Sequence, residues 1–173
     1  MYDVNKPVSA SPFLENIDTV MAGIARGAFI TVKDASGRIN AMTLGWATAG
    51  FMWRTPVFMA PVRPSRFTHD LLETAVDFTV TVPNADTAKK ELAICGTTSG
   101  RFGDKIANAG LTIINARATQ SPVVQCAGEV FECRIMYKTA MNEYPGPTTD
   151  MFYATGDSHT LYFAEIVQRY HIG

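Results

Sequence analysis

The sequence is poor in charge and has almost no excess of either sign. Only 18% of its 173 residues are charged, and 15 basic side chains stand against 16 acidic ones. Nucleic-acid binding is therefore not expected, because such proteins carry a clear basic excess. Disorder is excluded, since 47% of the residues are hydrophobic. A surface this short of charge suggests that part of it is buried against a partner, most simply a second copy of the chain.

Targeting sequences and paired-cysteine motifs are also missing from the sequence. Residues 1–6 show no basic start followed by an apolar core, so no signal peptide is visible. The longest uncharged stretch, residues 39–53, is too short to span a bilayer, and no membrane location is expected. Cys95, Cys126 and Cys133 form no C-x-x-C pair. This favours reduced thiols in a cytoplasmic protein, with no disulfide framework and no metal site.

Common catalytic signatures are absent as well. No G-x-G-x-x-G follows a predicted strand, and no P-loop, H-E-x-x-H, G-x-S-x-G or paired-carboxylate motif occurs. A Cys–His hydrolase built on Cys95 with His69 or His159 remains an alternative, but no spacing supports it. We therefore favour a structural role for Cys95, and no residue is assigned as catalytic.

Short apolar runs bounded by turn residues predict a chain dominated by strands. We expect strands at 28–33, 39–47, 57–62, 77–82, 111–116, 122–138 and 159–170, the first two forming a hairpin around the turn 34–37. Helices are expected at 65–75 with Ser65 as N-cap, from Asn84 or Asp86 through Ile94, and at 103–109 before Gly110. Residues 144–149 are expected to form a loop.

The connections are too short for regular crossover helices. The pattern therefore predicts a mainly β protein with a few helices, an antiparallel barrel rather than a doubly wound sheet. We find no internal repeat and no linker, so residues 1–173 are expected to form a single domain.

Four segments are candidates for ligand binding, each with a plain structural alternative. Residues 40–43 could present the backbone N–H and C=O groups of a strand to the edge of a flat heterocycle. The alternative is an ordinary strand with a polar first residue. Residues 63–68 combine two arginines and two hydroxyls at a predicted helix start, which suits a phosphate or is simply a cap. Residues 95–105 form a Gly-rich and hydroxyl-rich loop with a lysine, an anion cradle or a turn. His159 titrates near neutral pH or is structural.

Taken in order, these segments resemble the flavin reductase-like family of FMN-binding split barrels, in particular its flavoredoxin-type members. The resemblance runs from about Phe29 to Val167. It rests on residues 40–46 (Asn-Ala-Met-Thr-Leu-Gly-Trp), 63–68 (Arg-Pro-Ser-Arg-Phe-Thr) with 71–72, 78–83, 95–96, 99–101, 104–105, 132–133 and 159–167.

The resemblance implies an antiparallel Greek-key split β-barrel, a homodimer, and one FMN per subunit near the dimer interface. The cofactor-binding residues that it implies are Asn40, Ala41, Met42, Thr43, Arg63, Ser65, Thr68, Cys95, Gly96, Ser99, Gly100 and Lys105. Arg63, Ser65 and Thr68 would hold the phosphate, with Lys105 near it. Trp53 and His159 are candidates for the substrate or the flavin face, and residues 142–153 form a variable segment that would cover it.

The implied activity is that of an FMN-dependent oxidoreductase of the flavin reductase or flavoredoxin type. It would pass electrons from NAD(P)H or a redox partner through bound FMN to a small-molecule or protein acceptor. The alternative is a non-enzymatic FMN-binding electron carrier between proteins, and a weaker one is a structural or hydrolytic protein without flavin. The same fold supports the first two, so fold alone does not separate them.

Overall fold

The protein is described by a computed structural model that covers residues 11–143 and 146–173. Its strands are β1 (Ala28–Lys33), β2 (Ile39–Leu44), β3 (Thr48–Met52), β4 (Thr55–Val62), β5 (Asp77–Pro83), β6 (Ile113–Ile114), β7 (Val123–Val124), β8 (Gly128–Ala140) and β9 (Thr160–Ile172). Its helices are α1 (Ile17–Ile24), α2 (Phe67–Leu72), α3 (Lys89–Thr97), α4 (Lys105–Asn108) and α5 (Pro147–Phe152), with short 3-10 turns η1 (Pro12–Leu14) and η2 (Gly100–Phe102).

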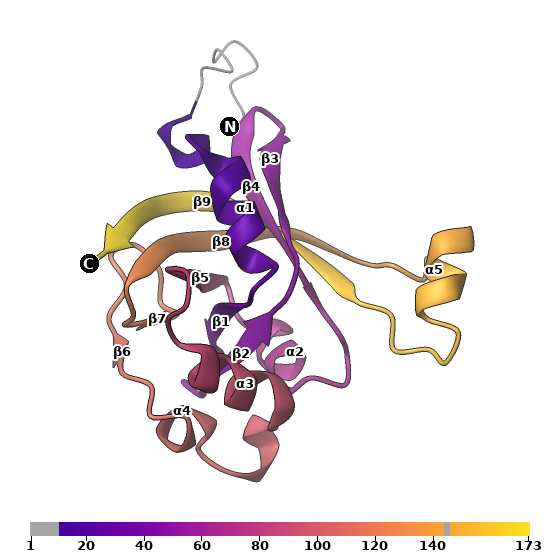
Figure 1. Ribbon diagram of the computed structural model, residues 1–173. Helices are drawn as coiled ribbons and strands as arrows, with labels where there is room; N and C mark the ends of the chain where they lie inside the picture. Colours follow the sequence, from indigo (N-terminus) through magenta and orange to yellow (C-terminus); the bar gives the residue numbers. More distant parts are fainter. Residues whose placement is uncertain (1–10, 144–145) are drawn as a thin grey trace.

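Seven strands form one antiparallel sheet in the order β2-β1-β5-β8-β9-β4-β3, and β6 pairs with β7 beside it. The sheet curls around its core, while β8 and β9 extend beyond it as a long arm that carries α5 at its tip (Figure 1). Within the described part of the chain, the edge strands β2 and β3 do not pair with each other, so the barrel is split. The predicted mainly β, antiparallel architecture is confirmed.

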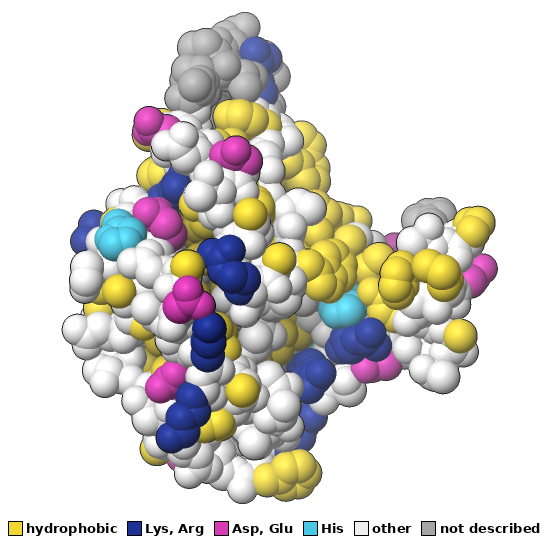
Figure 2. All heavy atoms as spheres, in the orientation of Figure 1, with side chains coloured by type: hydrophobic (Ala, Val, Ile, Leu, Met, Phe, Trp, Pro, Cys, Tyr) yellow, Lys and Arg dark blue, Asp and Glu magenta, His cyan; other side chains and the backbone are white. Residues whose placement is uncertain are grey.

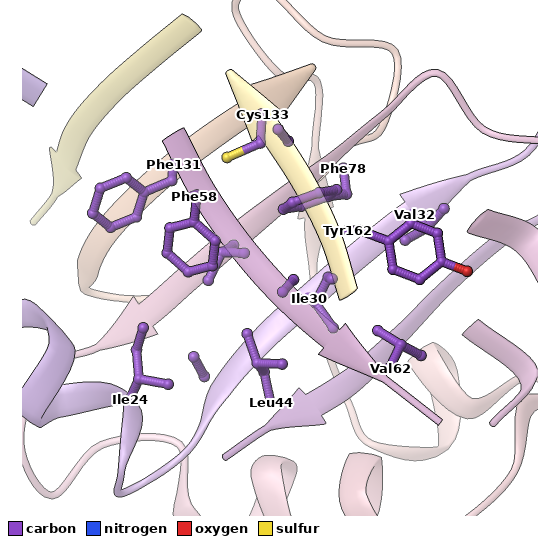
Figure 3. Packing of buried hydrophobic residues seen from close by; sticks show 14 of the residues in the cluster. Ile24, Ile30, Val32, Leu44, Phe58, Val62, Phe78, Phe131, Cys133 and Tyr162 are labelled. Atoms are coloured by element: carbon purple, nitrogen blue, oxygen red, sulfur yellow. The ribbon is translucent and has the colours of Figure 1, made fainter. Parts of the chain in front are cut away.

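Two apolar clusters lie on opposite faces of β1 and β2, because successive side chains of a strand alternate. The larger fills the barrel and includes Phe58, Phe78, Phe131 and Tyr162, all fully buried (Figure 3). The smaller packs α3 and α4 against the outside of the sheet, where Phe29, Ala41, Leu92, Cys95, Ala109 and Val124 meet. This second cluster holds the loop between α3 and α4 beside β2.

The predicted hairpin of 28–33 with 39–47 is confirmed, as is the strand from Asp77. The predicted strand 122–138 is wrong, since residues 125–127 interrupt it between β7 and β8. Gly128 begins β8 at φ +155°, and a Cβ there would collide with the backbone of Val82 and Pro83. β3 and α1 were not predicted.

Two helix predictions and one loop prediction need correction. α2 is shorter than 65–75, and its N-cap is Arg66, which makes no side-chain capping bond; Ser65 does not cap it. α3 begins at Lys89 after Ala88, so neither Asn84 nor Asp86 caps it. The predicted loop 144–149 is wrong from Pro147 onward, because α5 starts there, while residues 144–145 lie outside the described ones.

Candidate functional site

A cleft opens where the end of β2 meets the β4–α2 connection and the α3–α4 loop. Its volume is about 100 Å³. It is lined by Met42, Thr43, Ser65, Arg66, Phe67, Thr68, Cys95, Gly96, Thr97, Thr98, Ser99 and Lys105. Three of the four candidate segments thus meet in one place, although the chain separates them widely.

A groove continues the cleft along β2 toward the arm. It shares Met42, Thr43 and Arg66 with the cleft and is bounded further on by Trp46 and His159. Arg63, at the end of β4, also lines this groove rather than the cleft itself. The cleft and groove together form one elongated depression with basic side chains at several points.

The contacts of β2 show which predicted residues face the cleft. Thr43 lines it, and its hydroxyl donates to the Leu92 carbonyl at 2.6 Å, which ties α3 to β2. Asn40 donates through Nδ2 to Thr68 Oγ1 at 2.8 Å, and both side chains are buried. Asn40 therefore fixes α2 against the sheet. Ala41 lies in the outer apolar cluster and does not line the cleft.

Gly100 supports the cleft from behind. A Cβ at this position would collide with the Asn40 amide and would lie 2.8 Å from the Phe67 ring, so only glycine fits between them. The adjoining Arg101 forms a bidentate contact with Asp70, with Nη2 at 3.0 and 2.8 Å from the two carboxylate oxygens. This ion pair holds the α3–α4 loop against α2.

Lys105 is a buried cation, with 6% of its surface exposed. Its Nζ donates to the carbonyl oxygens of Cys95 and Thr98, each at 3.3 Å. Among residues 11–143 and 146–173, no carboxylate forms an ion pair with it. Burial lowers the pKa of Lys105, because desolvation disfavours its charged form. A buried cation without an acidic partner at the wall of a cleft suits an anionic ligand.

Ser65 has an anionic partner of its own. Its amide donates to Asp157 Oδ1 at 3.0 Å and its hydroxyl to Oδ2 at 2.6 Å. Arg63 donates to the Asp157 carbonyl at 3.0 Å, and its Nη1 lies 3.7 Å from the carboxylate. Partial burial opposes ionisation of Asp157, but the bonds from Ser65 and the Arg63 charge outweigh it and lower its pKa. A carboxylate thus occupies the donors predicted for a phosphate.

Arg66 lines both the cleft and the groove, and sequence reasoning did not count it among the binding residues. Its Nη1 donates to the Gly96 carbonyl at 3.5 Å, across the cleft. A signal was present, because a cation at a helix N-cap opposes the helix dipole unless an anion accompanies it.

His159 lies at the far end of the groove, just before β9. Its Nδ1 is 2.6 Å from the Tyr153 hydroxyl, and its ring meets Trp46 edge-on at 5.2 Å between centroids. Burial, assisted by the Arg63 charge, lowers the pKa of His159 to about 4. The imidazole is therefore neutral at pH 7.

Trp53 lies elsewhere, in the β3–β4 turn, where it is 53% exposed and takes a φ of 50°. It is not among the residues that line the cleft or the groove. Burial raises the pKa of the Cys95 thiol. The reactive thiolate is thus disfavoured, which argues against the Cys–His hydrolase alternative.

Two further observations concern only the described part of the chain. No group of three or more His, Cys, Asp or Glu side chains is placed to hold a metal ion. None of its helices combines the length and apolar character that a bilayer crossing requires.

Comparisons with known proteins place the cleft in context. The sequence profile of the family described as "Flavin reductase like domain" matches residues 21–173. An uncharacterised protein of Archaeoglobus fulgidus is 26% identical over 132 residues, which cover 76% of this chain and 65% of that protein. This chain therefore spans slightly less than two thirds of that relative.

Solved structures share the fold at low sequence identity. Flavoredoxin of Desulfovibrio vulgaris (Miyazaki F) superposes with a TM-score of 0.66 at 19% identity, over 84% of this chain and 68% of its own. An FMN-binding protein from Thermus thermophilus with bound 1-cyclohex-2-enone gives 0.64 at 21% identity, over 84% and 69%. The NADH:FAD oxidoreductase of Streptomyces globisporus C-1027 gives 0.64 at 18%, over 84% and 74%.

Proposed function

Since the chain belongs to the family of flavin reductase-like domains, we propose that it is an FMN-binding oxidoreductase. It takes electrons from NAD(P)H or from a redox partner and passes them through bound FMN to an acceptor. The observation that carries the proposal is Lys105, a buried cation that lines the cleft and pairs with no carboxylate in the described ranges.

The side chains present suit the parts of FMN. The cleft, at about 100 Å³, has room for a phosphate and not for a whole flavin mononucleotide. Lys105 and Arg66 would meet the phosphate charges there, and the Ser65 amide and hydroxyl would add donors once the phosphate replaces Asp157. The groove beside Met42 and Thr43, with a volume of about 90 Å³, would then contact one edge of the flat ring system.

Bound FMN supplies the redox chemistry, accepting electrons as a pair or singly and releasing them in either form. The chain's own residues bind and orient. Arg101 and Asp70 hold the loop that carries the cleft's hydroxyls, and Asn40 holds α2. His159 is neutral and adds no charge at the groove's end. No side chain in the depression needs to act as an acid or base.

We also propose that the protein is a homodimer. Several large apolar side chains are exposed, among them Phe51 at 46%, Trp53 at 53% and Phe152 at 65%. They lie on the β3–β4 hairpin and on α5, and exposed large apolar side chains on two projecting elements suit surfaces that a second copy covers. Light scattering coupled to size exclusion, on the wild type and on Trp53→Ser, tests this; a monomeric wild type overturns it.

An absorbance spectrum and an FMN titration test the cofactor. We expect flavin bands in the purified protein, or uptake of added FMN with quenching of its fluorescence. A protein that neither contains nor takes up FMN overturns the proposal. Anaerobic addition of NADH or NADPH then separates the activities: reduction of the bound flavin with turnover indicates a reductase, and reduction by a protein donor alone indicates a carrier.

A further inference from the structure

A second, larger hollow lies between the barrel and the arm that carries α5. Its volume is about 440 Å³, within the usual range for small-molecule sites. Figure 2 shows a notch at this place, with hydrophobic surface on both sides and a histidine and basic side chains at its base. Its main lining residues are Trp46, Arg63, Met141, Phe152, Tyr153 and His159.

The hollow carries little net charge. His159 is neutral at pH 7, for the reasons given above. Among the described residues that line it, Arg63 is the one that is positively charged at pH 7, and it is already engaged. Its Nη1 donates to the backbone carbonyl of Asp157 and lies 3.7 Å from the carboxylate of the same residue. Its guanidinium carbon lies over the Tyr153 ring, 5.1 Å from the ring centroid. A dinucleotide would bring a pyrophosphate that no free cation here meets, so an uncharged ligand suits the hollow better.

The aromatic lining also contains one hydrogen-bond donor, on the imidazole of His159. The Tyr153 hydroxyl has one hydrogen and two acceptors within reach, His159 Nδ1 at 2.6 Å and Met141 Sδ at 3.6 Å. Because a neutral imidazole nitrogen is the stronger acceptor and the closer one, we assign the hydrogen to Nδ1, which leaves the His159 proton on Nε2. Within the described residues, that Nε2 has no hydrogen-bond partner. Trp46 and Tyr153 stand edge-on to the imidazole, at 5.2 and 5.6 Å between centroids. The hollow thus offers aromatic surfaces and one N–H donor.

We infer that this hollow binds a flat, uncharged aromatic carbonyl compound of one or two rings, of the quinone class. The rings of Trp46 and Tyr153 contact its faces and edges, and His159 Nε2 donates to a carbonyl oxygen. Phe152 closes the hollow from α5. The resemblance in sequence implies only that His159 lies near the substrate or flavin face and that residues 142–153 cover it; it names no ligand for this hollow and does not include Trp46 or Phe152 in it.

The site adjoins the proposed flavin position, because Trp46, Arg63 and His159 line both the hollow and the groove. Its role as the acceptor site rests on the proposed function, whereas binding does not. On reduction the quinone gains two electrons and two protons and becomes the hydroquinone. Both electrons and one proton would come from reduced FMN, which would be reoxidised, and the second proton would come from solvent.

Trp46 provides a direct reporter of binding. The chain has two tryptophans, so Trp53→Phe leaves Trp46 alone. The probe is duroquinone, whose four methyl groups block addition of the cysteine thiols. In FMN-free protein of this background, we expect saturable quenching at micromolar duroquinone, beyond the linear quenching of N-acetyltryptophanamide. Nicotinamide mononucleotide, flat but charged, should bind at least tenfold more weakly.

Matched variants on α5 complete the test. Phe152→Ala should weaken duroquinone binding at least fivefold, and Tyr153→Phe about threefold. Met151→Ala is the control, since this residue is 69% exposed on the same helix and does not line the hollow. Quenching that is only linear, or equal effects of Met151→Ala and Phe152→Ala, overturns the inference. So does Trp46 emission that changes with protein concentration while duroquinone has no effect, because a second copy then fills the hollow.

The two proposals fail separately. If the protein takes up no FMN but shows saturable quenching, the proposal that the hollow binds a quinone stands and the proposal of FMN binding fails. If the protein contains FMN but shows no saturable quenching, the proposal of FMN binding stands and the proposal that the hollow is the acceptor site fails.

Discussion

Glu132 and Asp157 both accept hydrogen bonds from backbone amides, but they do so in opposite surroundings. Glu132 on β8 is fully buried and accepts from the amides of Arg117, Ala118 and Thr119 at 2.7, 2.6 and 3.1 Å. The Tyr170 hydroxyl adds a fourth bond at 2.9 Å. Asp157 sits on an exposed turn of the arm, and 35% of its side-chain surface is open to solvent.

The difference shows how burial sets the role of a carboxylate. The donors around Glu132 converge on a carboxylate that is fully buried, so no water takes its place when this acceptor is removed. The donors of Ser65 are exposed, and water or another anion can replace Asp157 at little cost. The first carboxylate therefore fixes residues 117–119 to the barrel, whereas the second occupies an anion site that a ligand can take over.

The largest effect is expected for Glu132→Gln. The substituted amide brings an NH2 group toward backbone N–H donors, so one of these N–H groups loses its acceptor and the NH2 group itself finds none there. Since an unsatisfied buried group costs ~1–3 kcal/mol and two are affected, we expect a loss of about 3 kcal/mol in the free energy of unfolding. Urea denaturation measures it.

The control for this prediction is Glu165→Gln. Glu165 pairs with Arg134 at 3.7 Å, and both side chains are widely exposed. Exposed pairs contribute ~0–1 kcal/mol, so this variant should unfold nearly as the wild type does. Equal losses in the two variants would contradict the distinction between buried and exposed carboxylates.

Lys105→Met should separate binding from stability. A charged hydrogen bond contributes ~1.5–3 kcal/mol, so FMN affinity should fall roughly 10- to 150-fold. Folding should not suffer, because an apolar side chain replaces a buried cation without an acidic partner. Fluorescence titration with FMN and urea denaturation give the two readings.

Lys89→Met serves as the matched variant, since Lys89 lies on α3 with 74% of its side chain exposed and pairs with Asp86. It should leave both readings unchanged. A Lys105→Met protein that loses stability while keeping its FMN affinity would show that the lysine is a structural anchor, as Glu132 is.

Local patterns in the sequence predicted much of the sheet. The hairpin of β1 and β2 and the strand β5 followed from apolar runs bounded by turn residues. β3 was not predicted, because its hairpin turn is formed by Trp53 and Arg54 at φ 50° and 61°. Glycine or asparagine at such positions is the usual sequence signal for a hairpin turn. The helix start at residue 65 failed for a different reason. Ser65, a good cap by type, bonds instead to Asp157, 92 residues away.

The site was predicted through the resemblance rather than through spacing. Met42, Thr43, Cys95 and Lys105 do meet at the cleft, because the outer apolar cluster brings α3 and α4 onto β2. Asn40, Gly100 and Ala41 support it from behind or from the core. The contact between Asp157 and Ser65 was not predictable from the sequence, and neither was the hollow between the barrel and α5. Both depend on how the arm folds back onto the barrel.

His159 is less buried than Glu132 and more buried than Asp157. The pH dependence of stability that it causes therefore tests how burial acts on a titratable group. Burial lowers its pKa to about 4 from 6.5, so the folded protein resists a proton that the unfolded chain accepts. Its contribution to stability is therefore present above pH 6.5 and is lost as the pH falls toward 4. We expect this loss to be about 1–2 kcal/mol, reduced because the ring is partly exposed.

Urea denaturation at pH 7 and pH 4.5 measures this loss. His159→Gln should lose less stability on acidification than the wild type, since the other titrating groups cancel in the comparison. His171→Gln, on an exposed part of β9, should follow the wild type. If wild type and His159→Gln respond equally to acid, the groove accommodates the charged ring.

Asp157→Asn is expected to give the smallest effect and bears most directly on the comparison. Asparagine tolerates the left-handed backbone of this position, where φ is 59°, so the turn is preserved. The change removes a negative charge beside Ser65 and Arg63. Two charges a few ångströms apart near water interact by ~1 kcal/mol, so affinity for FMN should rise roughly fivefold.

This gain should shrink at high salt, because exposed charges are screened, while the free energy of unfolding stays nearly unchanged. Asp150→Asn, on α5 in the same arm, removes an equal charge that does not contact Ser65 and should not alter FMN affinity. If Asp157→Asn weakens binding instead, the carboxylate holds Ser65 in place for the phosphate rather than competing with it. Asp157 would then resemble Glu132, a fixed support, in spite of its exposure.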